Sequence, residues 1–406
     1  DDGQELHVMT VVDDMIQVTN SQALLDHFLD FLRTKFEITN DGEINWFLGV
    51  AYNKNPDTLN WHATQTAYLD RSLEKYEMER ETCKDVPMDP SFKITLEDLD
   101  DNPSEAITHL YRSMIGTLLY LAVWTRPDIA MVVNLLARYM TKASPRLIKA
   151  ARNVFRYLKG TRTDGITFFH IDPLQDERRG NGLSADLIKG GLKKNDRLTA
   201  YSDASDADDP VKRRSTGGYI VLYNGSPVSW NSGLQRLTTL STCESEYVQA
   251  ALTVKEVLYL RELYAHAGHP ERCATPIYED NQAAMRLSEN PVNRGMTKHI
   301  ARRFHFIRQA NDDFQIALIP INTMKNTADA FTKPLGHQLF TRHRHGMGVR
   351  DVRDLGKRED DERKLCMKLS RVNVFRTRPD DYEHTAWKRP GTTWQPSACG
   401  TCVYRV

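Results

Sequence analysis

Apolar positions in the first 160 residues alternate between short strand-like runs and segments with the spacing of amphipathic helices. Two strand-like runs meet around Asp13-Asp14, and a second hairpin follows Gly42. Pro127 marks a helix start, with Thr125 as the expected cap. The predicted elements are strands within residues 5–18, a helix at 21–36, a hairpin at 42–50, a strand near 59–62, and helices at 65–78 and 145–160.

These three helices have defined apolar and basic faces. The side chains expected to face the core are Leu25, Phe28, Leu32 and Phe36, then Leu69, Leu73 and Tyr76, then Ile148, Ala151, Phe155 and Leu158. A basic ridge lines the third helix: Lys149, Arg152, Arg156 and Lys159. The ridge could bind the phosphates of a duplex, or it could be only a solvated helix face.

The second half predicts a mixed α/β (α+β) domain. The Asn224-Gly225 pair is a strong hairpin signal, and Ser241 with Glu244 forms a capping box that opens a long helix. The expected order is strands at 197–203, 218–223 and 227–230, a further strand near 236–240, a helix at 241–264, a strand at 276–280, helices at 282–288 and 297–309, a strand at 314–319, and a last helix from Ala328.

Composition narrows the function classes only slightly. The 406 residues suggest two or three domains, because single cores rarely exceed about 250–300 residues. Lys+Arg and Asp+Glu both total 54, so affinity for nucleic acid must come from local basic clusters. No apolar run reaches the roughly 18 residues of a membrane span, so no membrane partner is expected. The scattered cysteines fit a reducing compartment, and Cys399-Gly-Thr-Cys402 is interpreted as an incidental pair rather than a zinc site.

Four acidic residues lie where the predicted elements would deliver them to one cleft. Asp203 and Asp280 end strands, Glu246 lies near the start of the long helix, and Asp329 begins the last helix. Carboxylates are hard ligands for Mg²⁺, and two ions about 4 Å apart can stabilise both the attacking and the leaving oxygen of a phosphodiester. We therefore expect two Mg²⁺ ions, with Mn²⁺ as an alternative. Asp203 would bridge both, Glu246 and Asp280 would complete one, and Asp329 would hold the other.

Short motifs occur along the chain in an order typical of one family. They include Val11-Val12-Asp13-Asp14, Trp46-Phe47-Leu48-Gly49-Val50, Gln65-Thr66-Ala67-Tyr68, Tyr201-Ser202-Asp203, Glu244-Ser245-Glu246-Tyr247, Asp280-Asn281-Gln282 and Ala328-Asp329-Ala330-Phe331-Thr332-Lys333-Pro334-Leu335. Over about residues 5–340, the chain resembles the reverse transcriptase and ribonuclease H region of copia-type (Ty1/copia) retrotransposon polyproteins. Val11 stands where this family usually has Tyr.

The resemblance implies a ribonuclease H-like mixed five-stranded sheet with flanking helices, preceded by a partial reverse-transcriptase palm and thumb and a connection region. The expected divisions are 1–100 for the partial reverse transcriptase, 101–170 for the connection helices, 171–196 for a linker or insertion, 197–340 for the ribonuclease H-like domain and 341–406 for a tail of unknown structure. The chain starts at Asp1 rather than Met, which suggests a piece of a longer polypeptide.

The resemblance also guides the choice among neighbouring acids. In ribonuclease H domains the metal-binding Glu precedes a small, apolar stretch, which favours Glu246; Glu244 is expected to cap the helix at Ser241. Glu279 alternates with Asp280 along its strand and should face the other side. Asp206, Asp208 and Asp209 are interpreted as solvated turn acids. Asp13 and Asp14 would be a residual polymerase metal site that lacks its third carboxylate.

The implied activity is Mg²⁺-dependent endonucleolytic cleavage of RNA in RNA–DNA hybrids, with the upstream reverse transcriptase and integrase portions of the polyprotein as partners. The expected location is intracellular, in a cytoplasmic virus-like particle or in the nucleus. A second basic set would contact phosphates: Lys298, Arg302, Arg303 and Arg308. The alternative is a catalytically decayed, non-enzymatic nucleic-acid-binding remnant of a retroelement. An integrase is disfavoured, because integrases lack the Ala328–Leu335 motif.

Overall fold

The computed structural model of the protein describes residues 3–39, 42–56, 58–169, 198–206, 208–271, 273–281 and 301–354, with short strands at 395–396 and 402–403. Two compact units contain them, Asp1–Arg353 and Asp354–Val406. In the second unit β13 (Gln395–Pro396) pairs with β14 (Cys402–Val403).

The predicted linker, the predicted helix at 282–288 and the Cys399–Cys402 pair lie wholly or largely outside the described residues. No described helix is both long and apolar enough to cross a bilayer. The domain boundaries remain predictions.

The first residues form a hairpin and a helix. β1 (Leu6–Val11) pairs antiparallel with β2 (Asp14–Thr19), which leaves Val12 and Asp13 as a two-residue turn. α1 (Gln22–Arg33) begins after Ser21, whose hydroxyl accepts the Leu24 N–H at 3.4 Å. The predicted hairpin and helix are confirmed. Phe36, however, lies beyond the helix end and is 63% exposed, so its predicted inward position is wrong.

An antiparallel five-stranded sheet collects strands from both ends of the first unit, in the order β12-β6-β5-β4-β3. Leu48 and Gly49, between β3 and β4, both have positive φ, as a tight hairpin turn requires. β12 follows the predicted end of the nuclease-like domain, so regular structure continues past residue 340. The strands are β3 (Trp46–Phe47), β4 (Val50–Lys54), β5 (Trp61–Thr64), β6 (Asp164–Phe168) and β12 (Val349–Asp351).

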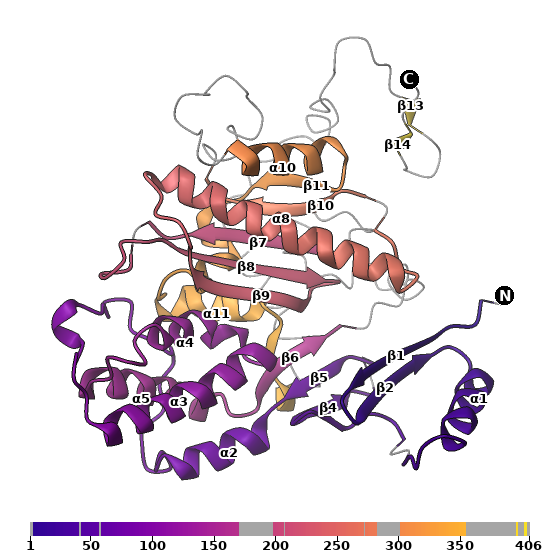
Figure 1. Cartoon of the computed structure of the whole chain (residues 1–406), viewed down its shortest axis with the longest axis horizontal. Helices are drawn as coiled ribbons and strands as arrows, with labels where there is room; N and C mark the ends of the chain where they lie inside the picture. The colour runs from indigo at the N-terminus through magenta and orange to yellow at the C-terminus, as the bar shows by residue number, and fades with distance from the viewer. Residues whose placement is uncertain are drawn as a thin grey trace. The chain divides into compact units, whose positions relative to one another are not determined.

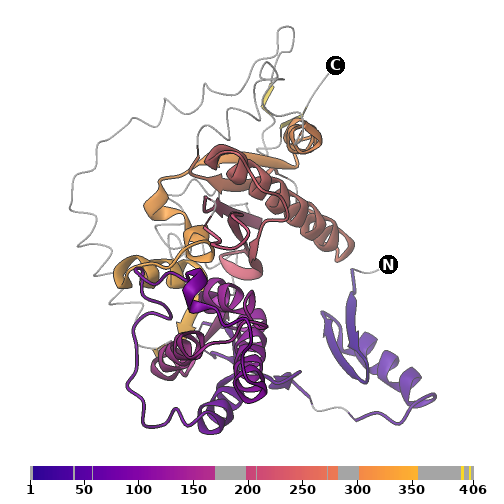
Figure 2. The same cartoon turned by 60° about the vertical axis from the view of Figure 1, so that its left-hand side comes forward.

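Three helices, α3, α4 and α5, gather into one layer in both views (Figures 1 and 2). α5 begins after Ser144, whose hydroxyl accepts the Leu147 N–H at 3.3 Å. It buries Ala151, Phe155 and Leu158, as its apolar spacing predicted. The bounds are α2 (Thr66–Lys75), which packs against α5, α3 (Glu105–Trp124), α4 (Ala130–Ala137) and α5 (Pro145–Gly160).

The helix start predicted at Thr125 is only partly right. Pro127 does occupy the first turn, a 3₁₀ turn at Pro127–Ile129 that leads into α4. Thr125 instead follows the last residue of α3, and its hydroxyl donates to Gln65 Oε1 at 2.8 Å. The buried Arg126 guanidinium donates twice to Asp128, at 2.9 and 2.8 Å, and the Tyr157 hydroxyl donates to the same carboxylate. The Thr125–Asp128 segment therefore links neighbouring helices, and Thr125 does not cap a helix.

The second five-stranded sheet is mixed and has the order β11-β10-β7-β8-β9. β7, β10 and β11 run parallel, whereas β7, β8 and β9 are antiparallel neighbours. α8 (Thr242–His266) crosses one face of this sheet (Figure 1). The predicted ribonuclease H-like α/β (α+β) fold is thus confirmed. The strands are β7 (Leu198–Ala204), β8 (Thr216–Tyr223), β9 (Ser226–Leu234), β10 (Thr275–Glu279) and β11 (Ile316–Pro320).

Two predicted elements of this half are wrong. The segment 236–240 is not a strand. Leu240 is 83% exposed and none of residues 236–240 is buried, so no face of this run packs in the core. The last helix does not begin at Ala328. A 3₁₀ turn, η5 (Thr327–Phe331), comes first, and α11 (His337–Gly346) starts after Pro334, which lacks the N–H needed to continue the turn.

The mixed sheet is buried on both faces by alternating side chains. Val221 belongs to the core beneath α8, whereas Ile220 and Leu222 belong to the core shared with α3 and α5. The Trp230 indole N–H donates to the Ala122 carbonyl at 2.8 Å and so ties β9 to α3. The connection helices and one face of the nuclease-like sheet therefore share a core, and the face beneath α8 has a core of its own.

We expect Arg126→Leu to destabilise the first unit by about 3–5 kcal/mol, because it leaves the buried Asp128 carboxylate without its cation. Urea denaturation measures this loss. Arg33→Ala is the matched control, since the Arg33–Asp30 pair is exposed and should matter by no more than about 1 kcal/mol. Equal stability losses in the two variants would show that the buried pair does not hold this junction.

Candidate metal centre

Close packing of η5 against β8 brings two aspartates together. Asp203, near the end of β7, pairs in register with Gly218 of β8. A Cβ added to Gly218 would lie 2.4 Å from the Cβ of Phe331, so only glycine lets η5 approach this strand. Asp329 lies on η5, two residues before Phe331, and is thereby held next to Asp203.

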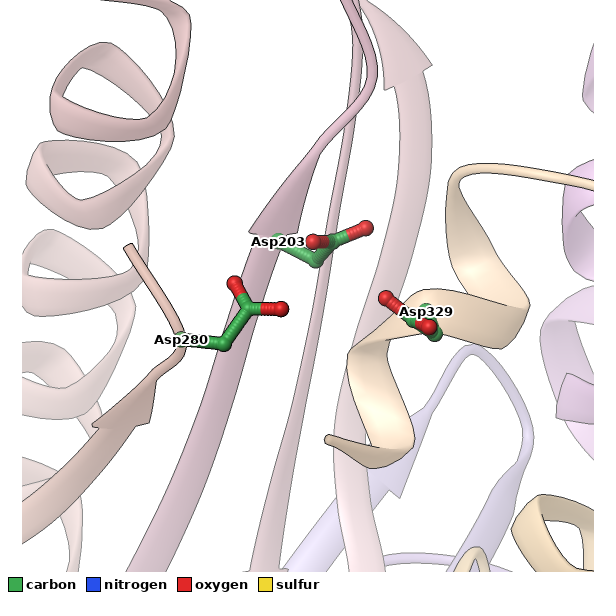
Figure 3. A group of neighbouring side chains, drawn as sticks. All are labelled: Asp203, Asp280 and Asp329. Carbon is green, nitrogen blue, oxygen red and sulfur yellow. The ribbon is translucent and has the colours of Figure 1, made fainter. Parts of the chain in front are cut away.

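Three aspartates converge at this point (Figure 3). One carboxylate oxygen from each of Asp203, Asp280 and Asp329 lies within 4.8 Å of the others. Asp280 follows β10, which is parallel to β7, so both strands deliver their carboxylates at the same sheet edge. Asp203 and Asp329 are buried, whereas Asp280 is partly exposed. The group therefore has a solvent-facing side at Asp280.

Side-chain bonds fix the segment that carries Asp329. The Asn326 side-chain amide donates to the Ser202 carbonyl at 2.8 Å, and the Thr332 hydroxyl donates to the Asp203 carboxylate. The Lys333 ammonium lies 2.9 Å from Asp329 Oδ1. This segment is therefore attached to β7 on both sides of Asp329.

Glu246 belongs to a second acidic group with Glu279 and Asp280, again with oxygens within 4.8 Å of one another. The expectation that Glu279 faces away from Asp280 is wrong. The reason is that Asp280 lies just beyond the end of β10, where strict strand alternation no longer applies. Glu279 is the residue that sequence reasoning missed. An acid directly before Asp280, in a strand buried along its whole length, was the available signal.

Glu244 lies at the start of α8, as predicted. The Ser241 hydroxyl accepts the Glu244 N–H at 3.3 Å, which makes Ser241 the cap. The Glu244 carboxylate accepts the backbone N–H of Leu240 at 2.9 Å, one residue before the predicted partner. Glu246 lies two positions further on and reaches the acidic group instead. The geometry thus separates the two glutamates in the way the sequence suggested.

Burial and mutual repulsion raise the pKa values of these acids strongly. Burial, together with the Asp329 charge, raises the pKa of Asp203 to about 7. Burial, together with Glu279, raises the pKa of Glu246 to about 11. Burial raises the pKa of Glu279 well above its ordinary value, and burial also raises the pKa of Asp329. Clustered acids that resist ionisation are typical of sites that bind a cation.

The three acids after β7 differ in burial. Asp206 and Asp208 are exposed, although Asp208 also accepts the Thr216 N–H at 2.9 Å. Asp209 is buried, so its interpretation as a solvated turn acid is wrong. Its carboxylate accepts the Lys212 N–H at 2.6 Å and lies 3.5 Å from the Arg138 guanidinium. Asp209 fixes a loop to α4 rather than joining the acidic groups.

The predicted basic ridge on α5 is mostly bound within the chain. Arg152 donates to Tyr76 O and to Glu81. Arg156 donates to Thr82 O at 2.7 Å, and Lys159 donates to Glu81 O at 2.8 Å. Lys149 is exposed, and it is the member for which the described residues offer no hydrogen bond or ion pair.

The other predicted residues are scattered. Arg303 and Arg308 are partly exposed on α10 (Ala301–Asp312), and Arg302 belongs to the same helix. Lys298 lies outside the described residues. Asp13 and Asp14 are exposed at the hairpin tip, and within the described ranges they join neither acidic group. The structure therefore brings together Asp203, Glu246, Asp280 and Asp329, but not the polymerase pair.

Known proteins similar to this chain include retroelement proteins. The retrovirus-related Pol polyprotein from transposon RE1 of Arabidopsis thaliana is 33% identical over 350 residues, which are 86% of this chain and 22% of that polyprotein. A transposon Ty5-1 protein of Saccharomyces cerevisiae is 30% identical over 264 residues, 62% of this chain and 74% of that protein. No protein-family model matches.

Among solved structures, LC11-RNase H1 in complex with an RNA/DNA hybrid is 13% identical, with a TM-score of 0.26, over 33% of this chain and 93% of that chain. The fold and the acidic groups define a ribonuclease H-like protein. The chain belongs to the copia-type retrotransposon Pol polyproteins and spans about a fifth of the length of the RE1 polyprotein, 22%.

Without metal, we expect Asp203→Asn to become relatively more stable as pH rises. The folded chain holds the Asp203 proton up to about pH 7, above the usual aspartate pKa, so this group's contribution is present at low pH and is lost as pH rises through about 7. Glu246, with its pKa of about 11, stays protonated in this window. The gain of the variant at pH 8 over pH 5 should be at most about 3 kcal/mol, since only the interval from pH 5 to about 7 contributes. Urea denaturation in chelator measures it; a relative loss at pH 8 would contradict the argument.

Proposed function

We propose that the chain is a divalent-metal-dependent ribonuclease that cuts the RNA strand of RNA–DNA hybrids endonucleolytically. The observation that carries the proposal is the gathering of five acidic side chains, four of them buried, in two groups that share Asp280. Such a concentration of like charge costs stability unless a cation neutralises it. Within unit 1 these acids gather at one edge of a ribonuclease H-like sheet, from its strands and from α8 and η5, and the chain belongs to a family of Pol polyproteins.

The donor set fits Mg²⁺ or Mn²⁺. Glu246 Oε2 and Glu279 Oε2 are buried and accept no hydrogen bond from other described residues, although the two carboxyl groups lie close enough to share a proton. Carboxylate oxygens without partners are the hard ligands that these ions prefer. Asp203, Asp280 and Asp329 would hold one ion, and Glu246, Glu279 and Asp280 another, so the shared ligand would be Asp280 and not Asp203 as the sequence led us to expect. When bound, two such ions supply an activated water and a stabilised leaving oxygen.

The chain's own residues orient this site. The Thr332 hydroxyl holds one oxygen of Asp203, and Asn326 fixes the turn that carries Asp329. Asp280 is the partly exposed member and marks the side from which a phosphate would approach. Deep burial of Asp203 and Asp329 excludes competing water from the rest of the group.

The hybrid substrate follows from the family rather than from a base-reading surface. A nuclease of this kind distinguishes its substrate by 2′-hydroxyls and duplex shape. The upstream reverse transcriptase and integrase portions of the polyprotein would be the partners. The setting would be intracellular, in a cytoplasmic virus-like particle or in the nucleus.

The second candidate is a nucleic-acid-binding remnant without turnover. Glu279 favours it, because a protonated Glu246–Glu279 pair could hold Glu246 away from an ion. Mg²⁺-dependent cleavage of an end-labelled RNA–DNA hybrid decides between the two. The proposed nuclease gives discrete internal cuts that chelator abolishes and leaves the matching DNA duplex intact. Hybrid binding without cleavage at any Mg²⁺ or Mn²⁺ concentration would favour the remnant.

We expect Glu246→Gln to abolish hybrid cleavage and to leave the melting temperature unchanged or raised, because burial and Glu279 already disfavour the charged form of this carboxyl and the neutral amide cannot ionise. Glu244→Gln is the matched control two residues away. It should retain cleavage and cost at most about 1 kcal/mol of stability through the helix start. Cleavage and melting of both variants are measured side by side, and the reverse pattern would exchange the two roles.

We expect Lys149→Ala to change phosphate binding and Arg156→Ala to change the stability of the fold. Lys149→Ala should leave the melting temperature unchanged and make the slope of log K against log salt shallower by about one phosphate contact. Arg156→Ala should lower the melting temperature, because it removes the bonds to Thr82. Hybrid binding at several salt concentrations tests this; an unchanged slope for Lys149→Ala would leave this lysine as part of a solvated helix face.

A further inference from the structure

The Lys333 ammonium is the cation that lies against the three-aspartate group. Its Nζ is 2.9 Å from Asp329 Oδ1, one helical turn along the same segment. At this distance the ammonium charge already neutralises part of the site.

The backbone under Lys333 is attached to β7, and its side chain is partly exposed to solvent. The Lys333 N–H donates to Asp329 O at 3.2 Å, and Asn326 and Thr332 attach the segment to β7. The stem lines a small cavity with Met88 and Val132. The Lys333 side chain is 44% exposed, whereas that of Asp329 is only 2% exposed. Of the two partners, only the lysine can leave toward solvent.

We propose that Lys333 is a built-in counter-cation that holds Asp203, Asp280 and Asp329 together in the metal-free chain and that a divalent ion must displace. The inference rests on the proposed metal-dependent function and adds a positioning residue to it. A divalent ion brings twice the charge of the ammonium and can accept an oxygen from each aspartate. The ion and the lysine therefore compete for the same carboxylates.

The two possible roles of Lys333 predict opposite changes in Mn²⁺ affinity when its charge is removed. If Lys333 is a competitor, Lys333→Met should bind Mn²⁺ about fivefold more tightly, the size of a partly exposed ion pair. The metal-free variant should also melt at a lower temperature, because the aspartates lose their neutralising charge. If Lys333 only orients Asp329, its removal should weaken Mn²⁺ binding instead. Methionine keeps the apolar stem in its cavity.

Isothermal calorimetry of the full chain with Mn²⁺ tests this, with melting in chelator as the second readout. Lys325→Met, an exposed lysine eight residues earlier, is the matched control and should match the unmodified chain. Lys333→Gln repeats the charge removal in case Lys333→Met folds poorly, and Lys333→Arg should bind as the unmodified chain does.

Weaker or unchanged Mn²⁺ binding by both charge-removing variants would overturn the counter-cation and leave the proposed nuclease standing, provided that the unmodified chain binds Mn²⁺ and cleaves hybrid. Absence of Mn²⁺ binding by the unmodified chain would overturn both proposals. The two failures are therefore distinguishable in one series.

Discussion

Repulsion among buried carboxylates is the constraint on which the nuclease-like half of this protein depends. Asp203, Glu246, Glu279, Asp280 and Asp329 lie in two groups with oxygens within 4.8 Å of one another. Left ionised and unpaired, such a cluster would oppose folding. Burial and the neighbouring acids raise the pKa values of Asp203 and Glu246, so the folded chain disfavours the charged forms of both carboxyls.

The rest of the fold holds these acids in place. Parallel β7 and β10 end at one edge, α8 brings Glu246 to it, and Gly218 lets η5 approach closely enough to bring Asp329. The connection helices cover the opposite face through Ile220 and Leu222, which share their core. The acidic side chains are therefore held by a hydrophobic core that includes the connection helices as well as the sheet.

Sequence predicted most of this architecture because its signals are local. The Asn224-Gly225 turn, the Ser241 cap and the apolar stripe of α5 each act over a few residues. The failures need tertiary information. Thr125 bonds to Gln65, sixty residues away in the chain, and so does not cap. Glu279 was assigned to the wrong side because alternation fails where β10 ends, and three ridge residues bind the loop near Glu81 rather than solvent.

If these acids form a divalent-cation site, anomalous scattering from crystals soaked in Mn²⁺ locates the ions. We expect one anomalous peak among Asp203, Asp280 and Asp329 and a second beside Glu246, Glu279 and Asp280, with Lys333 turned away from Asp329. Mn²⁺ bound elsewhere, or Lys333 still paired with Asp329 and no peak among the acids, would show that the acids do not form such a site.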